Sequence, residues 1–182
     1  MQDLGIISPS LDEFRALAAQ RRVIPVRLKV LADALTPIGI YRSLALQDDG
    51  TAAPGTFLLE SAKVTAEGES AAWDRYSFIG ASSRSTLTTV DGKVHWQGET
   101  PAGAPTEGDP VEAIPKPLHM LHTEPLPGLP PLTSGLVGYL GWDVVRRWEH
   151  LPSPPADDVH LPEFALNMVS DMAIHDNTDG TV

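Results

Sequence analysis

Apolar residues recur at helical spacing soon after the start of the chain. Ser10 and Glu13 have the spacing of a capping box, in which each side chain bonds the backbone of the other residue, so the pattern predicts a helix from there to about Gln20. Residues 23–30 then have the composition of a strand. Their proline, Pro25, cannot donate a hydrogen bond to a neighbouring strand, which predicts a position at the edge of a sheet.

A second helix is predicted to begin after Thr36. Thr36 is suited to an N-cap because its hydroxyl can accept a bond from the first turn, and Pro37 fits the first helical position, where no backbone donor is needed. The residues that follow form one apolar face at helical spacing, made of Ile38, Tyr41 and Leu44.

Two later stretches read as strands joined by a polar loop. Residues 57–61 are apolar until they reach Glu60 and Ser61, and residues 75–80 begin with Arg75 before they return to aromatic and β-branched side chains. If the two strands pair antiparallel, Glu60, Ser61 and Arg75 fall at the same end of the ladder. That end of the ladder is therefore a candidate functional site.

These three polar residues suit a zwitterionic ligand such as a free amino acid. Arg75 would hold its carboxylate, Glu60 and Ser61 its ammonium group, and Leu59 would form an apolar wall. Because side chains alternate across a strand, Glu60 and Ser61 can serve one ligand only at a frayed end, at a bulge or through a backbone group. The alternative is an ordinary hairpin edge with a weak surface pair between Glu60 and Arg75.

A hairpin is predicted in the middle of the chain. Residues 85–90 and 93–96 have strand composition, and the two residues between them, Asp91 and Gly92, are a strong signal for a tight turn between antiparallel strands. Residues 97–108 are rich in Gly, Pro and Thr and predict a mobile surface loop.

Prolines interrupt the helix that should follow this loop. Asp109 and Pro110 fit a helix start, but Pro115 and Pro117 lie where its second turn would run. An interior proline costs about 3 kcal/mol, so the helix is predicted to break there or to restart near Lys116.

The last third of the chain reads as strands and connecting loops. Residues 134–141 carry glycines three apart, but no Lys-Ser or Lys-Thr follows, which favours a buried strand approached closely by another backbone over a phosphate loop. A proline-rich acidic loop, 151–162, then precedes a long strand, 164–175. Residues 176–180 have turn chemistry that closes a hairpin, and the sequence stops as the return strand begins. We therefore expect the chain to be the front part of a longer polypeptide.

Composition narrows the possible partners and compartments. The net charge of −11 argues against nucleic acid and against an anionic membrane as partners. The chain has no cysteine, which excludes disulfides, thiol nucleophiles and thiolate metal sites. It shows no leader pattern and no apolar run of about 18 residues, so we expect a soluble, cytoplasmic protein.

No catalytic constellation stands out in the sequence. His119 and His122 are three residues apart, but nothing supplies the further ligands of a zinc site, and no serine lies in a Gly-x-Ser-x-Gly turn. On an acidic surface a stacking platform for nucleotides is not expected, so we assign the four tryptophans to core or edge packing: Trp73, Trp96, Trp142 and Trp148.

The chain carries an ordered run of motifs at residues 24–26, 36–41, 57–61, 75–80, 127–131 and 135–139. In order and rough spacing this run resembles the amino-terminal region of anthranilate synthase component I over nearly all 182 residues. In that family the Leu-Leu-Glu-Ser segment and the basic residue that opens the next strand form the site where the end product, L-tryptophan, binds and inhibits. The matching positions are Leu59, Glu60, Ser61 and Arg75. The family often has Lys at the last position, and Arg75 keeps that charge.

The resemblance implies an α+β fold of antiparallel sheets with flanking helices. It implies that residues 1–182 are the tryptophan-binding regulatory domain, truncated before the chorismate-binding catalytic domain. It also implies that the strand at 134–141 is a core strand followed by a helix at 143–149, with Val144, Val145 and Trp148 facing inward.

For the complete protein, the resemblance implies conversion of chorismate and ammonia into anthranilate and pyruvate. The ammonia would come from glutamine through an amidotransferase partner, component II, and the reaction would use magnesium bound outside this chain. No catalytic residue is expected within residues 1–182, so the chain alone should be inactive. Two alternatives stay open: the same region of aminodeoxychorismate synthase component I, or a stand-alone, non-enzymatic α+β binding module.

Overall fold

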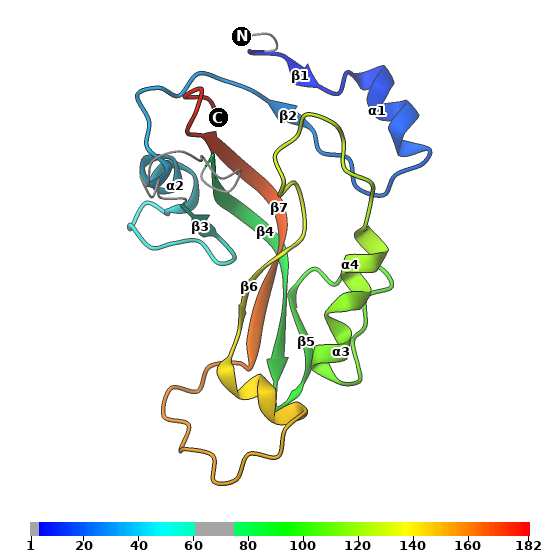
Figure 1. Ribbon diagram of the computed structural model, residues 1–182, viewed down its shortest axis with the longest axis vertical. Coiled ribbons are helices and arrows are strands. Elements are labelled where there is room, and N and C mark those ends of the chain that lie inside the picture. Colours follow the sequence, from blue (N-terminus) through cyan, green and yellow to red (C-terminus); the bar gives the residue numbers. More distant parts are fainter. Residues whose placement is uncertain (1–3, 61–74) are drawn as a thin grey trace, which may run out of the picture.

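The computed structural model describes residues 4–60 and 75–182. All its named strands pair antiparallel, in a five-stranded sheet of order β3-β4-β7-β6 with β5 on β4, and in a separate ribbon of β1 and β2 (Figure 1). Helices lie along the flanks of the sheet, which confirms the predicted α+β class. The strands are β1 (Ile7–Ser8), β2 (Arg27–Leu28), β3 (Phe57–Leu59), β4 (Tyr76–Val90), β5 (Lys93–Gly98), β6 (Leu136–Leu140) and β7 (Phe164–Asp176). Within the described ranges no helix is long and apolar enough to cross a lipid bilayer.

The first helix forms where the capping box predicts it. Helix α1 (Leu11–Ala18) has Ser10 as its N-cap, and the Ser10 and Glu13 side chains each bond the backbone of the other residue. The helix buries none of its residues, so local capping rather than packing defines it. Of the predicted strand at 23–30, only β2 forms, and it pairs with β1 outside the main sheet.

The second helix begins as predicted but turns a different face to the sheet. In α2 (Pro37–Ala45) the Thr36 hydroxyl accepts the predicted capping bond from the backbone of Gly39. Its buried residues are Ile40 and Ala45, whereas Ile38 and Leu44 are exposed, so the predicted apolar face was wrong. Both faces carry apolar residues at helical spacing, and packing on β3 and β4, which lies outside the local sequence, selects between them.

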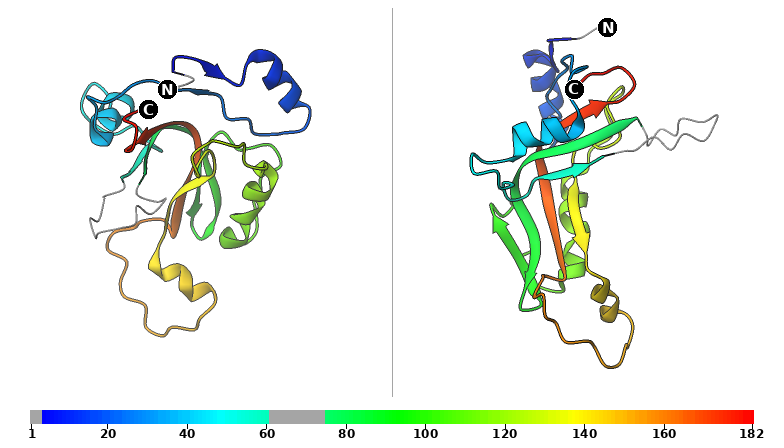
Figure 2. Two further views of the ribbon diagram at one scale, coloured as in Figure 1. Left: turned by 45° about the horizontal axis from the view of Figure 1, so that its top comes forward. Right: turned by 90° about the vertical axis from the view of Figure 1, so that its left-hand side faces the viewer.

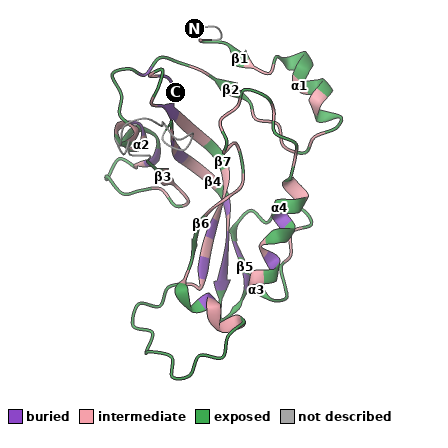
Figure 3. Cartoon of the chain, viewed as in Figure 1, coloured by how far each residue is buried: buried purple, intermediate pink, exposed green. Residues whose placement is uncertain are grey.

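The middle of the chain folds as predicted. Asp91 and Gly92 join β4 to β5, both with positive φ (51° and 69°), as a type I′ turn requires. The helix that the prolines interrupt divides into α3 (Pro110–Ala113), capped by Asp109, and α4 (Pro115–Leu121). These elements enclose the buried core of the lower half of the molecule (Figure 3), formed by Leu87, Val94, Trp96, Ala113, Phe164 and Leu166.

Strand β6 is an edge strand of the sheet rather than the predicted buried one. In the described part of the chain it pairs with β7 alone, and its residues are exposed or half-buried. The predicted close approach of another backbone is confirmed at Gly138, where a Cβ atom would lie 1.9 Å from the carbonyl oxygen of Ala165. Close approach in the plane of the sheet therefore explains the glycine, and burial of the strand's faces is not needed for it.

A short 3₁₀ helix, η2 (Trp142–Arg147), follows β6. Val144 is buried and Val145 is half-buried, but Trp148 is exposed, so its predicted inward position was wrong. Of the tryptophans assigned to packing, Trp96 is buried and Trp142 is exposed, while Trp73 lies outside the described residues.

Strands β4 and β7 form a long pair that is irregular in its middle. The register shifts three times between Gly80 and Ser85, with two extra residues on β4 and one, Ser170, on β7. Figure 2 shows that β4 bends strongly along its length, as bulged strands do. The extra residue on β7 also exchanges its faces: Ile79 lies opposite Ala173 above the irregularity, whereas Leu87 lies opposite Leu166 below it.

Candidate functional site

The two strands that carry the predicted site pair as the sequence indicates. Phe57 lies opposite Gly80 and Leu59 opposite Phe78, so β3 and β4 are antiparallel, and the end of β3 lies at the beginning of β4. Leu59 and Glu60 are exposed at this end, and Arg75 immediately precedes β4. The fourth predicted site residue, Ser61, lies outside the described residues.

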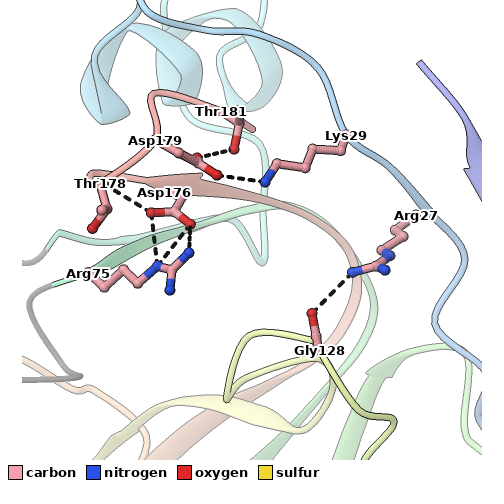
Figure 4. Close-up of polar contacts among 8 residues, drawn as sticks. All are labelled: Arg27, Lys29, Arg75, Gly128, Asp176, Thr178, Asp179 and Thr181. Carbon is pink, nitrogen blue, oxygen red and sulfur yellow. Dashed lines mark hydrogen bonds and ion pairs between the residues drawn. The ribbon is translucent and has the colours of Figure 1, made fainter. Parts of the chain in front are cut away.

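Arg75 forms an ion pair with an acidic residue of β7, the strand that pairs with β4 on the side away from β3. Its Nε lies 2.9 Å and its Nη2 2.6 Å from Oδ2 of Asp176, the last residue of β7 (Figure 4). The guanidinium group also lies over the ring of Tyr76, 5.0 Å from the ring centre. The Asp176 side chain is only 8% exposed and that of Arg75 is 44% exposed, so the pair is half open to solvent.

The ion pair sets the charge state of both partners. Burial by itself favours the protonated acid, but the hydrogen bonds from the Arg75 side chain and the Thr178 backbone outweigh it and lower the pKa of Asp176. The same hydrogen bond to Asp176 raises the pKa of Arg75. Both groups are therefore charged near neutral pH, and a fixed guanidinium group stands at the end of the β3–β4 ladder.

The turn after Asp176 hydrogen-bonds both the end of β7 and the segment that follows β2. The backbone amide of Thr178 donates a hydrogen bond to the Asp176 side chain. Oδ2 of Asp179 accepts a hydrogen bond of 2.7 Å from Nζ of Lys29, which lies directly after β2 (Figure 4). These bonds from Lys29, and those from Thr181, lower the pKa of Asp179. The Asp176 amide donates to the carbonyl oxygen of Thr181 and the Gly180 amide to that of Asp176, which confirms the predicted turn. Residues 180–182 also hydrogen-bond the segment at 30–32, a partner that the sequence had not indicated.

A cleft of about 710 Å³ opens beside the ion pair. It is lined by residues 23–29, 128–130, 133–134 and 169–174, and also by Arg75 and Asp176. Arg27 reaches from one wall to the other and donates to the carbonyl oxygen of Gly128 at 3.2 Å. Leu59 and Glu60 are not part of this lining, because they lie on the β3 side of β4, whereas Asp176 draws the Arg75 side chain toward β7.

The arrangement presents one guanidinium group, paired with a carboxylate, at the end of the β3–β4 ladder. In the part of the chain that the structure describes, no three His, Asp or Glu side chains lie close enough together to hold a metal ion. The residue that sequence reasoning missed is Asp176, which it assigned only to turn formation. No local signal could have joined it to Arg75, since 101 positions separate the two residues.

Comparisons with known proteins give one consistent result. Anthranilate synthase component 1 from Arthrobacter globiformis is 64% identical over 182 residues, which is 100% of this chain and 32% of that protein. The protein of the same name from Mycolicibacterium smegmatis is 49% identical over 173 residues, or 95% of this chain and 31% of that one. The chain thus spans about a third of the length of these curated relatives, and the match lies in their amino-terminal third.

A solved structure of anthranilate synthase component I from Streptococcus pneumoniae TIGR4 has a TM-score of 0.46 and 19% identity, and the match covers 81% of this chain and 28% of that one. No protein-family model matches the chain.

Proposed function

The chain belongs to the anthranilate synthase component I family, and from that premise we propose that it is the regulatory amino-terminal region of such an enzyme, residues 1–182, which binds L-tryptophan as a feedback inhibitor. The bound amino acid would contact Leu59, Glu60, Ser61 and Arg75. The observation that supports this best is the β3–β4 register, since it brings exposed Leu59 and Glu60 to the strand end where Arg75 stands.

Arg75 would act as the anchor for the ligand carboxylate. Asp176 contacts Nε and Nη2 of the guanidinium group, which fixes its plane while leaving the side chain 44% exposed. A guanidinium group held in one orientation loses less conformational entropy when a carboxylate binds it. Leu59 would then pack on the indole, and Glu60 and Ser61 would receive the ammonium group through a side chain or a backbone carbonyl.

The complete enzyme would carry out its chemistry outside this chain. We propose that it converts chorismate and ammonia into anthranilate and pyruvate, with the ammonia supplied from glutamine by component II. Magnesium would be held by the catalytic part of the polypeptide, which also contains the catalytic residues. Residues 1–182 by themselves would be inactive, and the complete enzyme would work in the cytoplasm.

Inhibition curves of the full-length enzyme test the regulatory role. Arg75→Ala removes the carboxylate anchor, and Ser61→Phe fills the pocket and removes a hydroxyl, so each should raise the tryptophan concentration needed for inhibition. The loss of one charge-assisted hydrogen bond, about 1.5–3 kcal/mol, corresponds to a rise of about tenfold to a hundredfold. Glu60→Gln should give a comparable defect if its carboxylate binds the ammonium group, and a milder one if its backbone does.

Arg84→Ala is the matched control, because Arg84 is an exposed arginine on the same strand that lies outside the proposed contacts. It should leave the inhibition curve unchanged. Turnover without tryptophan should change little in any variant, because tryptophan acts only through its different affinity for two conformations. If Arg75→Ala and Ser61→Phe enzymes are active and keep the wild-type sensitivity to tryptophan, the proposed site is wrong.

A further inference from the structure

Asp176 lies beside the proposed tryptophan site but is not one of its proposed contacts. Its side chain is nearly covered, and it binds Nε and Nη2 of Arg75 from β7, on the side of β4 that faces away from β3 (Figure 4). Leu59 and Glu60 lie on the β3 side. A ligand held there would contact Arg75, so Asp176 can act on it only through the guanidinium group or through its own charge.

The contacts of Arg75 leave one edge of its guanidinium group for a ligand. A carboxylate binds best to two parallel N–H groups of a guanidinium. Asp176 occupies the edge formed by Nε and Nη2, and the ring centre of Tyr76 lies 5.0 Å from Cζ, on one face of the group. None of the described residues accepts a hydrogen bond from Nη1. A ligand carboxylate can therefore bind two donors at the edge formed by Nη1 and Nη2.

Asp176 also cancels the charge of this guanidinium group. The pair of Arg75 and Asp176 carries no net charge near neutral pH, and neither does the neighbouring pair of Lys29 and Asp179. Glu60, directly after β3, adds a negative charge at the same end of the ladder. These groups together carry no excess of positive charge. Their field therefore gives little attraction to a simple anion, whereas a zwitterion can interact favourably at both of its charged groups.

We propose that Asp176 positions Arg75 and sets the specificity of the site. It holds the guanidinium group so that the edge formed by Nη1 and Nη2 meets the ligand carboxylate, and its charge makes the site select a zwitterionic amino acid over the corresponding anion. An unpaired Arg75 would attract any carboxylate. This inference rests on the proposed function, because it takes L-tryptophan as the ligand, but it concerns a residue outside the proposed contacts.

Titration calorimetry of the full-length protein at pH 7 tests the proposal with three ligands that share the indole group. L-Tryptophan is a zwitterion, indole-3-propionate lacks the ammonium group and is an anion, and tryptamine lacks the carboxylate and is a cation. The wild-type protein should bind L-tryptophan most tightly. Wild-type protein that binds indole-3-propionate as tightly as L-tryptophan would overturn the proposed selectivity.

Asp176→Asn should weaken the preference for L-tryptophan over indole-3-propionate by about fivefold, the effect of one charge a few ångströms away in water. Asp179→Asn is the matched control, because it removes the same charge from the same turn, but its partner is Lys29. It should keep the wild-type ratio of the two affinities. A purely structural role of Asp176 would weaken both ligands alike, so an unchanged ratio in Asp176→Asn, or equal shifts in both variants, would overturn the proposal.

Arg75→Ala provides an independent check that keeps Asp176 in place. It leaves the Asp176 carboxylate without its cation, so the variant should bind tryptamine about fivefold more tightly than the wild type does, while it binds L-tryptophan more weakly. Unchanged tryptamine binding would contradict the role of the Asp176 charge. Wild-type protein that binds no L-tryptophan would refute the proposed function itself, whereas tryptophan binding that needs Arg75 but has the same selectivity in Asp176→Asn would refute this inference alone.

Discussion

Replacement of Asp176 by asparagine tests the ion pair that fixes the candidate site. Asparagine keeps the size of the side chain and an oxygen that can accept the Thr178 backbone bond, but it removes the charge that faces Arg75. The change therefore isolates the electrostatic part of the interaction, and leaves a neutral amide beside the guanidinium group.

The expected cost follows from the exposure of the two partners. A hydrogen bond to a charged group is worth about 1.5–3 kcal/mol when it is shielded from water, whereas an exposed ion pair is worth at most about 1 kcal/mol. Asp176 is nearly covered, but Arg75 is 44% exposed and can recover much of its hydration when the partner is lost. We therefore expect Asp176→Asn to lower the free energy of unfolding by about 1–2 kcal/mol at pH 7.

Urea unfolding at pH 7 measures this loss, with Asp179→Asn as a matched control. Asp179 lies in the same turn and pairs with Lys29, but both side chains are 39% exposed, so its replacement should cost less than about 1 kcal/mol. If Asp176→Asn costs no more than Asp179→Asn, the argument from burial is wrong.

The pH dependence gives a second test of the same pair. Because the folded-state pKa of Asp176 is lowered, its contribution is fully present above the ordinary aspartate pKa of about 3.9 and is lost as the pH falls through the lower folded value. The stability difference between wild type and Asp176→Asn should therefore shrink from pH 7 toward pH 3. The other acids are common to both proteins and cancel in the comparison. A difference that stays constant over this range would refute the electrostatic explanation.

Two further substitutions test packing and capping. Gly138→Ala should lower the free energy of unfolding by about 1–3 kcal/mol in urea titrations, because the new Cβ meets the Ala165 backbone. It should destabilise the protein more than Gly50→Ala, where the position has a positive φ but open space. Equal costs would show that the close approach is relieved by movement. Ser10→Ala should lower the stability of α1 by about 1 kcal/mol, because the capping bond is lost. Since α1 buries no residue, the substitution should speed amide exchange in α1 without shifting the urea midpoint of unfolding, and a lower midpoint would show that α1 unfolds together with the core.

The sequence predicted those features whose cause lies within a few residues. The capping box at Ser10, the tight turn at Asp91 and Gly92, and the helix restart at Pro115 each depend on backbone chemistry that neighbours in the chain determine. The pairing of β3 with β4 followed in the same way, from two strand patterns close together in the sequence.

The features that the sequence did not predict depend on distant partners. The choice of Ile40 rather than Ile38 as a buried residue of α2 is made by the sheet, and the exposure of β6 depends on how many strands lie beside it. The partnership of Arg75 with Asp176 joins the first half of the chain to its last residues. In each case the deciding contact is tertiary, so it cannot be predicted from the residue pattern of one segment.

The irregular middle of β4 and β7 separates two packed regions that share one pair of strands. Ile40, Ala45 and Ile79 are buried above it, and the cluster around Leu87 is buried below it, while none of the residues 81–84 or 169–172 between them is buried. The two packed regions are therefore joined through this stretch by the backbones of β4 and β7 and by half-buried or exposed side chains. A change in the twist of these two bulged strands would therefore change how the two packed regions are oriented to each other, and Arg75 lies directly before the first residue of one of the two strands.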